Sequence, residues 1–202
     1  MNDIGKVEGI HILLLQGPIG FFFKRLDTSL RKGGAHTYRI GLNMGDSIFS
    51  YSDNYTPYYA EPKAWESFIE TFLQLHSIQK IFLFGDCRFY QRITIDIALK
   101  LEIEIYVFEE GYIRPEYITL EKYGVNEYSH LPRTAGFYDA LDLETITEPK
   151  DAVPNPISNW AIVIAYYFFA KLFHFRYIHY VHHREYSARK ELFLDYVALH
   201  EK

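Results

Sequence analysis

Two adjacent carboxylates stand where an apolar run of the chain stops, in the stretch "IEIYVFEEGYIRPEYITLE" over residues 103–121. Glu109 and Glu110 follow the apolar residues, and Gly111 comes directly after them. Neighbours on a strand point to opposite sides, so we expect one carboxylate to face a cleft and the other to tie down the loop. A carboxylate in a cleft can serve as nucleophile or general base in glycosyl chemistry. The same residues also fit a plain turn that leaves a sheet for solvent.

Two further groups of polar residues carry a similar ambiguity. Asp86 and Arg88 flank Cys87 in "FGDCRFYQR", where Asp86 could bind a ligand or simply cap a helix. Arg114 could hold a carboxylate or phosphate through two hydrogen bonds, or form a salt bridge with Glu109 or Glu116. None of these signals is specific by itself.

The sequence predicts neither a metal site nor a cofactor. His179 and His183 have the i, i+4 spacing of a helical metal pair, but no nearby acidic or cysteine ligand completes a set. The phosphate-binding pattern G-x-x-x-x-G-K-[ST], the dinucleotide pattern G-x-G-x-x-G and the hydrolase pattern G-x-S-x-G are absent from the sequence. Nucleotide-cofactor and serine-hydrolase chemistry therefore have no support.

The hydrophobic pattern predicts the scaffold that must position these residues. Short buried strands alternate with amphipathic helices, which is typical of a parallel sheet with right-handed crossovers. Gln16 and Gly17, Gly85 and Asp86, and Glu109 to Gly111 should then emerge at one edge, where helix N-termini favour an anionic ligand. The predicted strands are 10–15, 35–42, 81–84 and 103–108, and the predicted helices are about 22–32, 63–76 and 89–101.

The remaining segments are predicted as loops and C-terminal helices. Residues 43–62 read as a loop with at most a short strand near 48–51, and 112–156 as irregular. Two helices follow at about 157–174 and 183–200. The first is too short to span a bilayer, so we predict that it is buried between the sheet and its neighbours, with an interfacial membrane helix as the alternative. The domain prediction is a Rossmann-like α/β domain over 1–156 and a helical extension over 157–202.

Composition narrows the classes of partner and compartment. Twenty-one Lys and Arg residues stand against 26 Asp and Glu, for a net charge of −5, which gives no support to nucleic-acid binding. The single cysteine allows no intramolecular disulfide, and the first residues lack the basic segment of a secretory signal. We therefore expect a cytoplasmic protein.

Four segments together resemble the capsule polysaccharide biosynthesis family, in particular its KpsS/LipB-type β-Kdo transferases. They are "LLLQGPIGFFFKRL", "GDSIFSY", "LFGDCRFYQR" and above all "VFEEGYIRPEYITLEKYGVNEYSHLPR", so the resemblance runs from about Leu13 to Arg133, with a weaker match beyond. It implies retaining transfer of Kdo (3-deoxy-manno-octulosonic acid) from CMP-Kdo to a phosphatidylglycerol-type lipid, to start the capsule linker. It also implies a cytoplasmic enzyme peripheral to the inner membrane surface, working with other capsule-assembly proteins.

The resemblance assigns roles to particular residues. Related transferases carry Glu-Asp-Gly where this chain has Glu109-Glu110-Gly111, and by position Glu110 becomes the candidate nucleophile. Arg88 and Arg114 would hold the carboxylate of the donor sugar. The other predicted substrate-binding residues are Gln16, Gly17, Asp86, Gln91, Glu109, Gly111, Glu121 and Asn126; family members often carry a histidine at the position of Gln91.

Length separates this chain from the family it resembles. Family members are longer and have a second Rossmann-like domain with a His-Pro motif for the cytidylyl group, and this chain has no His-Pro. We therefore expect the N-terminal half of a GT-B-like glycosyltransferase, weakly active or inactive by itself, because transfer needs donor and acceptor held together. The alternative is a non-catalytic module that binds acceptor lipid or a capsule-assembly partner through its aromatic C-terminal helices.

Overall fold

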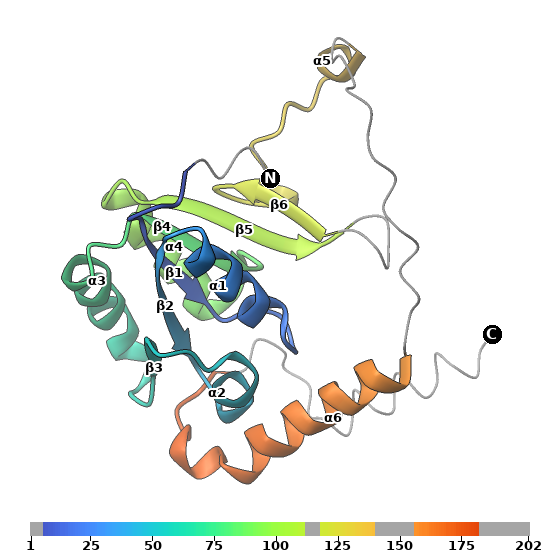
Figure 1. Ribbon diagram of the computed structural model, residues 1–202. Coiled ribbons are helices and arrows are strands. Elements are labelled where there is room, and N and C mark those ends of the chain that lie inside the picture. The colour runs from blue at the N-terminus through green and yellow to red at the C-terminus, as the bar shows by residue number, and fades with distance from the viewer. Residues whose placement is uncertain (1–5, 112–117, 140–155, 182–202) are drawn as a thin grey trace.

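A six-stranded sheet forms the centre of the computed structural model, which describes residues 6–111, 118–139 and 156–181. The strands lie in the order β3-β2-β1-β4-β5-β6; all neighbours pair in parallel except β6, which runs antiparallel to β5 (Figure 1). This arrangement is an α/β Rossmann-like fold. The strands are β1 (His11–Leu15), β2 (His36–Gly41), β3 (Tyr55–Pro57), β4 (Lys80–Phe84), β5 (Glu104–Glu110) and β6 (Ile118–Lys122).

Helices cover both faces of the sheet. Successive residues of a strand point to opposite faces, so each strand contributes side chains to two cores. Leu14, Phe82 and Phe108 pack in the core beneath α1, and Leu15, Leu83 and Val107 pack in the core that contains residues of α3 and α4. Nearly all of these strand side chains are fully buried, which explains their continuous apolar sequence. The helices are α1 (Phe22–Lys32), α2 (Met44–Ser50), α3 (Trp65–Leu75), α4 (Phe89–Lys100), α5 (Ala135–Asp139) and α6 (Pro156–Leu172), with short 3₁₀ turns at Pro62–Ala64, Asn126–Tyr128 and His174–Arg176.

The predicted sheet and its crossover helices are confirmed, with element boundaries displaced by a few residues. The predicted strand ending at residue 108 continues to Glu110, so both glutamates belong to β5. The predicted first C-terminal helix is α6, and the predicted helix over 183–200 lies outside the described residues.

Two predictions about the connecting segments were wrong. Residues 44–50 form helix α2, where a loop or short strand was predicted, and β3 follows it. Asn43 caps this helix by accepting a hydrogen bond from Asp46 N at 3.0 Å, and the polar side chain of Asp46 is itself buried. The segment predicted to be irregular contains α5 and the edge strand β6, which pairs antiparallel with β5.

The prediction for the environment of α6 was also wrong. The helix is not buried all round: it packs beside α2, with Tyr166 buried, while Ile164 and Phe168 are 60% and 58% exposed (Figure 1). Its apolar character around the whole circumference therefore does not reflect a position inside the core.

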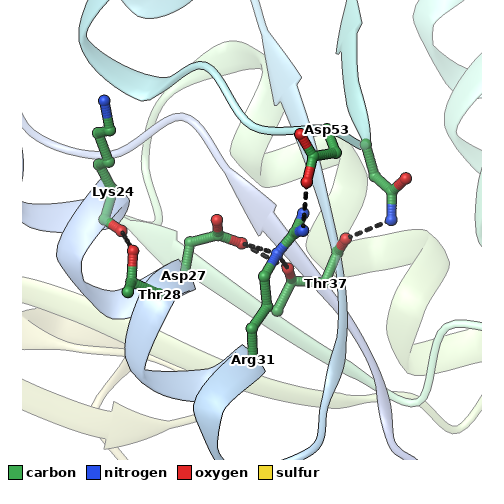
Figure 2. A network of polar contacts seen from close by, with 7 residues as sticks. Lys24, Asp27, Thr28, Arg31, Thr37 and Asp53 are labelled. Atoms are coloured by element: carbon green, nitrogen blue, oxygen red, sulfur yellow. Dashed lines mark hydrogen bonds and ion pairs between the residues drawn. The ribbon is translucent and has the colours of Figure 1, made fainter.

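A polar network joins α1 to β2 and to the loop before β3, as Figure 2 shows. Arg31 Nε lies 3.3 Å from Asp27 Oδ1 and 2.7 Å from Thr37 Oγ1, and its Nη1 lies 3.1 Å from Asp53 Oδ2. The Thr37 hydroxyl also donates to the Asp27 carboxylate. Thr37 and Asp27 are buried, and the Thr37 hydroxyl is, besides Arg31 Nε, the donor that satisfies the Asp27 carboxylate.

Replacing Thr37 with valine should lower the free energy of unfolding by about 1–3 kcal/mol, because Asp27 loses a buried donor while the side-chain volume is kept. Denaturant titration monitored by circular dichroism measures this change. Thr28→Val, on the exposed side of α1, is the matched control and should change stability by under about 0.5 kcal/mol. An equal effect of both substitutions would contradict the role of the network.

Candidate functional site

The strand order places a topological switch point between β1 and β4. From β1 the chain proceeds to β2 and β3 on one side, and from β4 to β5 and β6 on the other. In open α/β sheets, ligands bind outside the carboxyl ends of the strands at such a point. The segments that begin at Gln16 and at Gly85 leave the sheet there, so the candidate site lies at this edge.

Gln16 is the central polar residue of this edge. It is buried and has a left-handed backbone with φ 31°, a conformation that non-glycine residues keep only where the surroundings hold them. Its Nε2 donates to Asp46 Oδ2 at 3.0 Å and to the Tyr180 hydroxyl at 3.1 Å, and its Oε1 accepts from Gln91 Nε2 at 3.2 Å. The fold thus joins two predicted site residues, Gln16 and Gln91, that stand far apart in sequence.

Arg88 and Glu109 flank the turn after β4. Gly85 has φ 73°, and a Cβ atom placed on it would lie 3.4 Å from Arg88 Nε and 3.9 Å from Glu109 Oε2. The Arg88 guanidinium also stands over the ring of Phe84, 5.7 Å from its centroid. A cation from the start of α4 and a carboxylate from the end of β5 therefore share one small region, in which the guanidinium is the group able to hold an anion.

The two glutamates occupy different environments at the end of β5. Glu109 is half-buried, lies on the Val107 side of the strand, and accepts a hydrogen bond from Glu110 N at 2.9 Å. Glu110 is exposed and lies on the opposite side, paired in register with Ile118 of β6. Glu109 thus ties down the end of its own strand, whereas Glu110 is an exposed residue on the other side.

Asp86 connects β4 to the segment after β6. Its Oδ2 accepts from Val125 N at 2.9 Å and its Oδ1 from Cys87 Sγ at 3.1 Å. Helix capping by Asp86 does not occur, because the residue at the N-cap of α4 is Arg88. The hydrogen bond to Asp86, aided by burial, raises the pKa of the Cys87 thiol to about 11, so this cysteine is not a thiolate nucleophile at neutral pH.

The other predicted site residues serve mainly as framework. Phe23 of α1 packs directly against the backbone at Gly17, where a Cβ atom would lie only 2.5 Å from the Phe23 ring. Gly111 is buried directly after β5. Glu121 of β6 accepts a hydrogen bond from Ser129, and Asn126, with φ 54°, is an exposed residue of the 3₁₀ turn that follows β6. Arg114 lies outside the described residues.

Sequence reasoning missed Asp46, a buried carboxylate of the site. It accepts from Leu42 N and from the Tyr166 hydroxyl, each at 2.9 Å, as well as from Gln16. Burial raises the pKa of Asp46, and its hydrogen bonds oppose that shift. The residue stands in "GDSIFSY", yet the polar composition of that stretch concealed both the helix and the buried acid.

The tyrosines after residue 156 were also missed as part of this site. Tyr166 of α6 accepts from Asn43 Nδ2 at 2.8 Å, and Tyr177 bonds Ser47 Oγ at 2.8 Å. Together with the contact between Tyr180 and Gln16, these bonds hold the 156–181 segment against α2 and the carboxyl edge of β1. Burial raises the pKa of Tyr180, so its hydroxyl stays protonated and able to donate.

Two negative observations apply to the described residues. No three or more His, Cys, Asp and Glu side chains among them are grouped so that they could hold a metal ion. Within the same residues, every helix is too short or too polar to cross a membrane.

Comparison with known proteins places the chain among capsule proteins. Residues 79–200, more than half of the chain, match the family described as "Capsule polysaccharide biosynthesis protein". The chain is 35% identical over 192 residues to the capsule polysaccharide modification protein LipB of Neisseria meningitidis serogroups A and B, covering 88% of this chain and 44% of LipB. It is 31% identical over 181 residues to the capsule polysaccharide export protein KpsS of Escherichia coli, covering 90% of this chain and 46% of KpsS.

Among solved structures, a UDP-glucose 4-epimerase from Thermotoga maritima matches 80% of this chain and 52% of its own length, at 12% identity and a TM-score of 0.41. The chain spans less than half the length of the curated relatives that it matches. By the family match and by its identity to LipB and KpsS, the chain belongs to the capsule polysaccharide biosynthesis protein family.

Proposed function

We propose that this chain is the nucleophile-bearing half of a retaining glycosyltransferase that moves Kdo from CMP-Kdo to a phosphatidylglycerol-type lipid at the start of a capsule linker. The observation that carries the proposal is the pair Glu109 and Glu110 at the end of β5, with Arg88 beside Glu109 at the switch-point edge of the sheet. The family membership supports a role in capsule polysaccharide assembly.

Retention of the configuration at C2 of Kdo follows from two successive displacements at that carbon. The carboxylate of Glu110 attacks C2 of Kdo, the bond from C2 to the phosphate oxygen breaks, and CMP leaves with the bonding electrons. A hydroxyl of the acceptor lipid then attacks C2, releases the Glu110 carboxylate and gives up its proton to a base. Each displacement inverts C2, so the product keeps the configuration of the donor, and no metal or cofactor takes part.

The polar groups around the glutamates fit this chemistry. Arg88 has a guanidinium that can hold the carboxylate of Kdo through two hydrogen bonds. Gln91 is a neutral amide bonded to Gln16, so its role is to position the end of β1, and acid–base catalysis is left to other groups. Glu109 keeps the strand end in place through its bond to Glu110 N.

The remainder of a two-domain GT-B-like enzyme would supply the cytidylyl site. The curated relatives are more than twice as long as the part matched here, and transfer requires both substrates in one cleft. Other capsule-assembly proteins at the cytoplasmic face of the inner membrane are the proposed partners.

A transfer assay tests the proposal. CMP-Kdo is generated in the reaction and offered with a fluorescent phosphatidylglycerol-type acceptor to two samples: the chain alone, and a fusion that adds the unmatched part of LipB. We expect a Kdo-acceptor product from the fusion, identified by mass spectrometry, and little or none from the chain alone. A fusion that folds and binds acceptor but forms no product would contradict the proposal.

A further inference from the structure

An open pocket of about 450 Å³ lies beside α1. Its walls are formed by α1, between Lys24 and Lys32, and by residues 51–53 of the loop before β3. A volume of this size accommodates a small organic ligand.

The pocket is separate from the candidate site at the switch point. Arg31 in its wall bonds Thr37, which pairs in register with Ile12 near the start of β1. Gln16, by contrast, follows the end of β1. The polar wall of the pocket is therefore near the amino ends of the strands, whereas the candidate site is at their carboxyl ends.

The charged side chains of the pocket leave two cations uncommitted. Asp27 and Asp53 both pair with Arg31, at 3.3 and 3.1 Å. Within the described residues, no carboxylate pairs with the exposed Lys24 or Lys32. Figure 2 shows the Lys24 ammonium group pointing away from the network around Asp27. Three cations against two carboxylates favour an anionic ligand.

Two donors in the walls are buried without a hydrogen-bond partner among the described residues: Arg31 Nη2 and the Ser52 hydroxyl. Buried donors in native proteins are nearly always bonded, so this pair calls for an acceptor that the chain itself does not supply. The loop that carries Ser52 is well anchored. Ser52 O accepts from Tyr55 N at 3.2 Å, and Asn54 Nδ2 donates to Thr37 O at 3.0 Å.

Arg39 adds a buried cation behind this wall. It lies on the same face of β2 as Thr37 and is 2% exposed, and its Nε and Nη1 are also buried without a partner in the described part of the chain. Burial lowers the pKa of Arg39 to about 10, and Asp27 is the carboxylate that most strongly opposes the shift. Arg39 is thus charged at neutral pH and adds to the positive charge that Arg31 shares with Asp27.

The arrangement of donors suits a phosphate group. Lys24 and Lys32 stand about 12 Å apart along α1, so their ammonium groups approach the pocket from two ends. A carboxylate presents two oxygens in one plane, whereas a phosphate presents several oxygens in a tetrahedral arrangement and up to two charges. Tyr51 also lines the pocket and is 63% exposed, so its ring offers an apolar face to the rest of a ligand.

We infer that this pocket binds a small sugar phosphate. The phosphate lies between Lys24 and Lys32, next to the unpartnered donors of Arg31 and Ser52, and the sugar ring lies against Tyr51. Binding requires neither CMP-Kdo nor transfer, so it stands or falls independently of the proposed reaction. An acidic side chain from the part of the longer relatives that this chain does not span is the competing occupant, and a fusion that supplies this part distinguishes the two.

Amide chemical-shift titration of the isotope-labelled chain tests the inference. We expect glucose 6-phosphate to shift the amides of α1 and of residues 51–53, with a dissociation constant below about 1 mM that rises with salt. Glycerol 3-phosphate and inorganic phosphate, which lack the ring, should bind at least about fivefold more weakly. Lys24→Gln and Lys32→Gln should each raise the dissociation constant about fivefold, and Tyr51→Ala should abolish the preference for the sugar phosphate.

A matched substitution outside the pocket separates this site from general attraction of anions. Lys100→Gln in the last turn of α4 should leave the dissociation constant unchanged, and circular dichroism confirms that each variant is folded. No saturable shift up to about 10 mM ligand, equal losses from Lys100→Gln and Lys24→Gln, or equal affinity for glucose 6-phosphate and glycerol 3-phosphate would overturn the inference. So would a folded fusion with the unmatched part of LipB that no longer binds glucose 6-phosphate, because protein would then fill the pocket.

Discussion

Glu110→Gln should lower Kdo transfer by about 10³-fold or more in the fusion that carries out the reaction. Glutamine has nearly the same shape but cannot form the ester to C2, so the first displacement has no nucleophile. Glu110 is exposed at the strand end, and the substitution should leave the melting temperature nearly unchanged. Initial rates at saturating acceptor measure the loss, and mass spectrometry of the trapped enzyme detects whether a Kdo adduct forms.

Glu109→Gln is the matched comparison, because it removes the neighbouring charge on the other side of β5. Glu109 accepts a hydrogen bond from Glu110 N, which glutamine can still accept, so we expect a loss of only about tenfold. Glu70→Gln on the exposed side of α3 should have no effect. Loss of transfer with Glu109→Gln and retention with Glu110→Gln would assign the nucleophile to Glu109, which stands with Arg88 at the turn of Gly85.

Asp46→Ala should destabilise the fold by about 3 kcal/mol or more. The buried carboxylate receives hydrogen bonds from Leu42 N, Gln16 Nε2 and the Tyr166 hydroxyl, and alanine would leave these three donors without their acceptor. For a chain of about 200 residues this corresponds to a fall in melting temperature of roughly 6–12 °C. Differential scanning calorimetry at neutral pH measures it.

Asp53→Ala provides the control for removing an aspartate. Its side chain is 88% exposed and pairs with Arg31 at 3.1 Å, so we expect a change of at most about 1 kcal/mol. Asp46→Asn should fall between the two alanine variants, because its amide can still accept some of these bonds. An Asp46→Ala variant as stable as Asp53→Ala would show that the 156–181 segment is held without Asp46.

The local hydrophobic pattern of the sequence was enough to predict the alternating strands and helices that form the core of this protein. The central residues of β1, β4 and β5 are continuous apolar runs, at 12–15, 81–84 and 105–108, since both faces of their parallel sheet are covered. From that pattern alone, the turns at Gln16, Gly85 and Glu109 could be assigned to one edge. The motif around Glu109 and Glu110 likewise indicated the capsule family before any fold was known.

The predictions that failed concern elements whose formation depends on contacts with other parts of the fold. Helix α2 has few apolar residues to mark it, and its buried Asp46 is tolerable only because Gln16 and Tyr166 arrive from other elements. Strand β6 is a five-residue edge strand, most of whose side chains are exposed, and it exists by pairing with β5. Neither feature has a local signal strong enough to predict it.

The sequence by itself thus determined the Rossmann-like core, the edge at which the polar turns meet and the family. Only the tertiary structure decided which glutamate ties down the strand end, which residues brace Gln16, and which side of α6 meets solvent. The physical reason is that burial of apolar residues repeats with a local period. Hydrogen-bond partners such as Asp46 and Tyr180, by contrast, are brought together only when separate elements have packed.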